Sequence, residues 1–154
     1  MATEDIAAHF AIQSLKAQYF RFVDGKDWQR LRALFTKDAT LFFPAVQQAP
    51  LGVDDTLSWI ADGIGHGVSI HHGHMPEIEI LSSTRARGVW AMEDRVFWPA
   101  DEPSVLGLRS LHGFGHYHEE YRFVDGRWLI SALKLVRIHE VAVPTGGNAP
   151  SWAL

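Results

Sequence analysis

The chain has 154 residues, no cysteine and a formal net charge of −4 at pH 7 with neutral histidines. This length fits one domain, the missing cysteine excludes disulfides and thiolate chemistry, and the sparse Lys and Arg argue against nucleic acid or an anionic membrane as partner. The N-terminus lacks a basic region followed by an apolar stretch, and no run of about 18 apolar residues occurs. A cytoplasmic protein is therefore expected.

Helices are predicted first along the chain. Acidic residues follow Thr3, and apolar residues then recur at helical spacing until Asp24-Gly25, which is a suitable helix stop. A short second helix is expected over 28–35, and a third over 53–61. A short strand, 39–43, lies between them and ends at Pro44.

Strands are predicted for the rest of the chain, over 68–80, 86–98, 106–123 and 127–138. Two turn segments, Ser82-Ser83-Thr84 and Asp125-Gly126, indicate hairpins. Long antiparallel strands after a group of helices indicate an α+β fold within a single domain, 1–142. The tail, 143–154, is rich in Pro and Gly and is expected to be irregular, with Trp152 suited to a pocket flap or a subunit contact.

Asp94 is the one charged residue on the apolar face of its predicted strand. The even positions of 85–98 are otherwise apolar, whereas the odd positions are mostly charged. A carboxylate on an apolar face is costly unless it is paired, hydrogen-bonded or protonated. Asp94 is therefore either a structural anchor or part of a site.

Histidines form two groups, and imidazole is the side chain most often used for acid–base chemistry near neutral pH. His71, His72 and His74 lie beside Gly73 and Pro76, which predict a bulge or a sheet edge and obscure which histidine faces inward. The second group shares one parity on the third strand and consists of His112, His116 and His118.

Metal binding is an alternative to the acid–base role of these histidines. His72-Gly73-His74 and Glu79 give an H-x-H-x4-E spacing that is similar to the metal motif of the cupin family, but Pro76 interrupts the ligand run and the second cupin motif is not recognisable. The chain also lacks a glycine-rich phosphate loop and a nucleophile elbow. No metal and no cofactor are expected.

Over roughly residues 5–140 the chain resembles the SnoaL-like branch of the nuclear-transport-factor-2-like superfamily. The segments that carry the resemblance are IQSLKAQYFRFVDGKDWQRL, HHGHMPEIEI, GVWAMEDRV and YRFVDGRWLISALKLVRI. The resemblance implies a cone-shaped, mostly antiparallel curved sheet wrapped by N-terminal helices. It is strongest to bile acid 7α-dehydratases, scytalone dehydratases and hexachlorocyclohexane dehydrochlorinases, which are cofactor-independent lyases.

Five site residues follow from this resemblance. Bile acid dehydratases carry a tyrosine and an aspartate five residues apart at the end of the first helix, which match Tyr19 and Asp24. Their catalytic histidine and a later aspartate match His71 and Asp94. A second histidine of scytalone dehydratase points to His112.

The resemblance implies the following roles. Asp24 would orient His71, and His71 would take a proton from the substrate while Tyr19 donates to a carbonyl. Asp94 or His112 would protonate the departing hydroxyl. An apolar pocket for a small hydrophobic cyclic substrate is expected from Trp90, Met92, Trp98 and Phe114.

Two alternatives to a dehydratase-type lyase stay open. One is an isomerase or hydrolase that uses a carboxylate base in the same pocket. The other is a binding or assembly module like the small subunits of ring-hydroxylating dioxygenases. Family members usually form dimers or trimers through the outer face of the sheet, which would place Arg85, Arg87, Glu93 and Arg95 near an interface.

Overall fold

The computed structural model describes residues 3–146. In chain order the elements are α1 (Thr3–Asp24), α2 (Trp28–Arg32), β1 (Phe35–Phe42), β2 (Leu51–Gly52), α3 (Val53–Ile64), β3 (Val68–Ser82), β4 (Arg85–Phe97), β5 (Leu108–Val124) and β6 (Arg127–Pro144). Within this part of the chain, no helix is long and apolar enough to cross a membrane.

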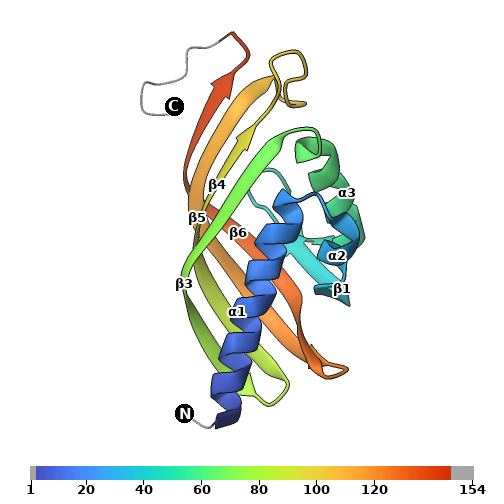
Figure 1. Cartoon of the computed structure of the whole chain (residues 1–154), viewed down its shortest axis with the longest axis vertical. Helices are drawn as coiled ribbons and strands as arrows, with labels where there is room; N and C mark the ends of the chain where they lie inside the picture. The colour runs from blue at the N-terminus through green and yellow to red at the C-terminus, as the bar shows by residue number, and fades with distance from the viewer. Residues whose placement is uncertain (1–2, 147–154) are drawn as a thin grey trace.

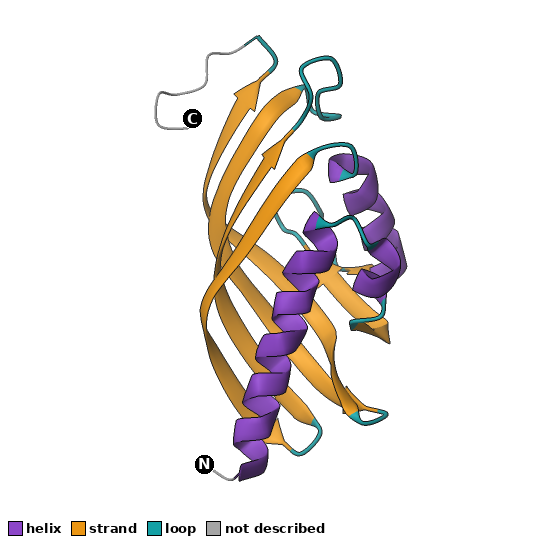
Figure 2. Ribbon diagram, in the orientation of Figure 1, coloured by secondary structure: helices purple, strands orange, loops and turns teal. Residues whose placement is uncertain are grey.

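A single curved sheet of six strands, in the order β2-β1-β6-β5-β4-β3, forms the back of the molecule. Neighbouring strands are antiparallel except β1 and β6, which are parallel. The long helix α1 runs across the hollow side of the sheet, and α2 and α3 lie beside its C-terminal half (Figures 1 and 2). The predicted α+β class, with a curved sheet wrapped by N-terminal helices, is confirmed.

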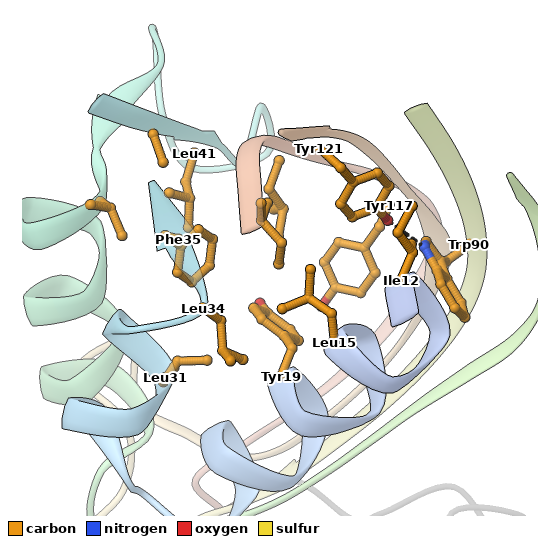
Figure 3. Packing of buried hydrophobic residues seen from close by; sticks show 14 of the residues in the cluster. Ile12, Leu15, Tyr19, Leu31, Leu34, Phe35, Leu41, Trp90, Tyr117 and Tyr121 are labelled. Atoms are coloured by element: carbon orange, nitrogen blue, oxygen red, sulfur yellow. Dashed lines mark hydrogen bonds between the residues drawn. The ribbon is translucent and has the colours of Figure 1, made fainter. Parts of the chain in front are cut away.

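The core fills the space between α1 and the sheet. Ile12, Leu15 and Tyr19 recur at helical spacing on α1 and are almost fully buried. They face Tyr117 of β5 across the space between the helix and the sheet (Figure 3). Along β4 the even positions from Ala86 to Val96 are buried and the odd ones are more exposed, as the alternation predicted.

The irregular features of the strands, a register shift and a tight turn, agree with the predictions. The register of β3 shifts between Gly73 and Pro76, and β3 is an edge strand, as expected. Asp125 and Gly126 both have positive φ, 50° and 80°, which is the geometry of a type I′ hairpin turn.

Several predicted boundaries were wrong. The second helix stops at Arg32 because β1 already begins at Phe35, and α3 continues to Ile64. The last strand extends to Pro144, so the first two residues of the predicted irregular tail pair with β5. The expectation for Trp152 lies outside the described residues.

Candidate functional site

A cavity of about 230 Å³ opens between the C-terminal half of α1, helix α3 and the sheet. Its walls are largely apolar, and its polar groups come from five different elements and from the loop between β4 and β5. The apolar lining includes Val23, Trp59, Ile60, Ile64, Val96, Trp98, Leu108, Leu111 and Leu135; the polar lining consists of Tyr19, His71, Asp94, Ser104, Tyr117, Arg137 and Glu140. A mainly apolar cleft with a few polar groups is the usual form of a small-molecule site.

His71 and Asp24 form a hydrogen-bonded pair at the edge of this cavity. Asp24 is the last residue of α1, and its Oδ1 lies 2.6 Å from Nδ1 of His71. The backbone N–H of His71 donates to Oδ2 of the same carboxylate at 2.9 Å. Because a carboxylate accepts from Nδ1–H, the neutral ring keeps its lone pair on Nε2.

Asp94 lies directly across from His71 on the neighbouring strand, since the two residues are register partners of β3 and β4. Its Oδ2 is 3.8 Å from Nε2 of His71. The imidazole therefore sits between two carboxylates, Asp24 on one side and Asp94 on the other. A positive charge on His71 would be stabilised by both.

Arg137 of β6 pairs with Asp94 through two hydrogen bonds, Nη1 to Oδ1 at 2.6 Å and Nη2 to Oδ2 at 2.7 Å. This fork uses both carboxylate oxygens as acceptors, which is the geometry of an ionised Asp94. Burial alone would lower the pKa of Arg137, but the hydrogen bonds and charge of Asp94 outweigh it and raise that pKa. The side chain of Asp94 is only 5% exposed, and this arginine pairs with its charge.

The Asp94–Arg137 pair needs the absence of a side chain at Gly113. This glycine is the register partner of Asp94 on β5. A Cβ built on Gly113 would lie 1.8 Å from Nη1 of Arg137 and 2.6 Å from Oδ1 of Asp94. The glycine thus leaves the space through which the arginine crosses β5 to reach β4.

Tyr19 and Tyr117 form the inner wall of the cavity. Their rings meet edge to face with centroids 5.9 Å apart (Figure 3). Burial raises the pKa of both phenols, with a further contribution from the negative charge of Asp94. Both hydroxyls therefore stay protonated and can donate hydrogen bonds near neutral pH.

The structure brings together four of the five residues predicted to be catalytic. Tyr19, His71 and Asp94 line the cavity, and Asp24 bonds to Nδ1 of His71. His112 is separated from them, because it pairs with Arg95 of β4 on the outer face of the sheet, where its Nε2 lies 3.3 Å from Oε1 of Glu93. The predicted place of His112 in the site was wrong for this reason.

Only Trp98 of the four predicted pocket residues lines the cavity. Phe114 lies on the outer face beside His112, with ring centroids 4.4 Å apart. Trp90 points inward, but it is part of the closed core, where its Nε1 donates to the hydroxyl of Tyr121 at 2.8 Å. Met92 is buried in the same core.

Arg137 and Tyr117 are site residues that the sequence interpretation missed. Arg137 could have been found from its position on β6. It shares the inward parity of Leu133 and Leu135 on β6, both of which are buried. A charged residue in phase with apolar ones is the same signal that identified Asp94 on β4. Among residues 3–146, no group of three or more His, Asp or Glu side chains is arranged to hold a metal ion.

Comparison with known proteins places this geometry in a family. The model of the SnoaL-like domain matches residues 4–134. A relative from Gibberella zeae named "Probable cyclase FGR4" is 25% identical over 138 residues, which cover 83% of this chain and 89% of the relative.

Solved structures share the fold at lower identity. A crystal structure titled "Putative Scytalone Dehydratase" from Novosphingobium aromaticivorans has a TM-score of 0.77 and 21% identity, covering 97% of this chain and all of that one (100%). A hexachlorocyclohexane dehydrochlorinase, LinA Type2, has a TM-score of 0.75 and 20% identity, covering 96% of this chain and 97% of that one. The chain belongs to the SnoaL-like domain family.

Proposed function

We propose that the protein is a cofactor-independent lyase that eliminates water, or a comparable small leaving group, from a small hydrophobic cyclic substrate. The observation that carries this proposal is the placement of His71, with Nδ1 bonded to Asp24 and Nε2 facing Asp94 at the cavity. A histidine oriented by a carboxylate in this way is a suitable general base.

The elimination would begin with transfer of a proton from carbon to Nε2 of His71. The electron pair of that C–H bond would be delocalised onto an adjacent carbonyl oxygen, which Tyr19 or Tyr117 would stabilise by donating a hydrogen bond. The resulting imidazolium would be stabilised by Asp24 and by Asp94.

The second step would return the proton from His71 to the departing hydroxyl, which leaves as water as the new double bond forms. This assignment replaces the earlier candidates for the acid. Both oxygens of Asp94 accept hydrogen bonds from Arg137, and His112 is on the other face of the sheet.

The lining of the cavity favours an apolar, uncharged substrate. The polar groups that line the cavity include two carboxylates, those of Asp94 and Glu140. The one arginine in the lining, Arg137, already bonds Asp94 and lies 3.6 Å from Glu140. An anionic substrate would meet this negative charge without a free cation to pair with. Near the cavity, the apolar side chains of Trp59, Val105 and Leu106 are exposed and suit an apolar ligand.

Isomerisation or hydrolysis by a carboxylate base fits this geometry less well. Asp94 accepts two hydrogen bonds from Arg137, and Asp24 accepts from the imidazole and backbone of His71 and from Ser69. Their oxygens are thus already directed at protein donors and not at the cavity. His71 is the group with an unused lone pair.

The test uses a panel of neutral cyclic β-hydroxy ketones, with elimination followed by the ultraviolet absorbance of the conjugated enone. We expect His71→Ala to lower kcat/KM by about 10²–10⁴-fold, the usual contribution of a general base. His112→Ala removes a histidine from the outer face and should leave the rate unchanged. Equal rates for the two variants would contradict the proposal, as would incorporation of solvent deuterium into substrate by His71→Ala at the wild-type rate.

A further inference from the structure

Lys26, immediately after α1, occupies a backbone position that normally belongs to glycine. The N–H of Asp27 donates to the carbonyl of Phe22, and the N–H of Lys26 donates to that of Val23, which together form a Schellman helix end. Lys26 itself is the left-handed residue of this motif, with φ of 57°. A side chain at such a position is strained, whereas glycine adopts it freely.

The side chain of Lys26 is the first member of a chain of hydrogen bonds that ends at His71. Nζ of Lys26 donates to Oγ of Ser69 at 2.6 Å, and Oγ of Ser69 donates to Oδ1 of Asp24 at 3.0 Å. The same oxygen of Asp24 lies 2.6 Å from Nδ1 of His71. We call Lys26, Ser69 and Asp24 the Lys26 relay.

The relay is partly shielded from water, with the Asp24 side chain 26% exposed. Ser69 is buried at 5% exposure, and Lys26 is half-buried. Ser69 and His71 lie two residues apart on β3 and so face the same side of the strand, toward the end of α1. In such a setting a cation and a carboxylate joined by one hydroxyl interact more strongly than at an exposed surface.

We propose that Lys26 is a positioning residue for the general base, acting on His71 through Ser69 and Asp24. This rests on the proposed role of His71. The positive charge of Lys26 and the Ser69 hydroxyl both draw electron density from Oδ1 of Asp24. Asp24 then holds the Nδ1 proton of His71 in place without drawing that proton toward itself, so the imidazole keeps a defined tautomer.

The test reads the Nδ1–H proton of His71 by NMR without any substrate. Loss of the cation or of the hydroxyl makes Asp24 a stronger acceptor, and a stronger hydrogen bond moves this resonance downfield. We therefore expect a downfield shift in Lys26→Met and in Ser69→Ala, and a return to the wild-type position in Lys26→Arg. Lys37→Met removes an exposed lysine of β1 and serves as the matched control for one lost charge.

Lys26→Gly separates the effect of the lost charge from the effect of the backbone strain. It removes the same cation as Lys26→Met but relieves the left-handed strain, so it should show the same resonance shift with a higher melting temperature. If Lys26→Met fails to fold, Lys26→Gly still tests the relay. No shift beyond that of Lys37→Met in either lysine variant would overturn the proposal, and so would a shift in the lysine variants without one in Ser69→Ala.

These outcomes are independent of the proposed elimination, because the resonance requires no turnover. A failure of the relay would leave the enone assay of His71→Ala unaffected. A failure of that assay would leave the hydrogen-bond measurement interpretable as a property of the Asp24–His71 pair.

Discussion

Two buried ion pairs lie on the hollow side of the same sheet, and they differ in what surrounds them. Asp94 and Arg137 border the cavity, where Arg137 keeps 19% of its side chain exposed. Lys16 and Glu119 lie farther along α1 and β5, and both side chains are 0% exposed. One pair faces a space that a ligand can enter, and the other is sealed in the core.

The sealed pair is satisfied entirely by its neighbours. Nζ of Lys16 contacts Glu119 and lies over the rings of Tyr117 and Tyr19, at 3.6 and 4.1 Å from their centroids. The hydroxyl of Tyr121 donates to Oε2 of Glu119 at 2.5 Å. A buried charge in this protein therefore marks a candidate site only where one of its neighbours is open space.

The largest expected loss of stability comes from removing one charge of the sealed pair, Lys16 and Glu119. Lys16→Met leaves the carboxylate of Glu119 buried without its cation, which should lower the free energy of unfolding by about 3–5 kcal/mol. The measurement is denaturant unfolding, with exposed Lys37→Met as the control. Adding Glu119→Leu should recover most of the loss, because removing both charges costs far less than removing one. A Lys16→Met protein as stable as its control would show that the core there admits water.

The chain's three tyrosines, Tyr19, Tyr117 and Tyr121, give a second test. Burial raises the pKa of each, so the folded protein keeps its phenolic protons above pH 10, where the unfolded chain loses them. Stability from these groups is therefore complete below about pH 10 and is lost as pH rises, by about 2 kcal/mol for the three together near pH 10.5.

Tyrosinate absorbance should accordingly appear together with the loss of circular dichroism in an alkaline titration. If two tyrosines titrated before unfolding, Tyr19 and Tyr117 would be the candidates, because they alone line the cavity among the three. Such a result would mean that the cavity and the sealed core open separately.

The smallest of these effects is expected from Gly113→Ala, which acts on the open pair. The added methyl group would overlap the guanidinium of Arg137 and push it from Asp94. We expect a loss of about 1–2 kcal/mol in unfolding free energy, since the displaced arginine can still reach water. Gly63→Ala, in helix α3 with open space around it, should be neutral or slightly stabilising. Equal stability of the two variants would show that the Asp94–Arg137 fork contributes little.

The sequence predicted the fold and named some of the residues that meet at the candidate site, for reasons that strand parity explains in part. Asp94 stood out because its apolar neighbours on β4 set the phase, and the resemblance supplied Tyr19, Asp24 and His71. On β5 the inward positions include Gly113 and Gly115, which carry no hydrophobic signal. His112 was included because of the resemblance alone, and parity on this strand gave no signal against it.

Contacts between distant segments were beyond reach of the sequence alone. Lys16 and Glu119 are separated by 103 positions, and Lys26 and Ser69 by 43. Neither local periodicity nor composition brings such residues together. Trp90 and Met92 were correctly predicted to face inward, but only the path of α1 decides where the interior is core and where it is cavity.

The backbone hydrogen bond from His71 to Asp24 has a consequence apart from catalysis. His71 lies on an edge strand, and the amides on the outer side of such a strand are free to pair with a strand of another chain. Here the carboxylate of Asp24 occupies the amide of His71. The end of α1 therefore blocks edge-to-edge aggregation at the same point where it orients the imidazole, and protection against misassembly and preparation for chemistry depend on one side chain.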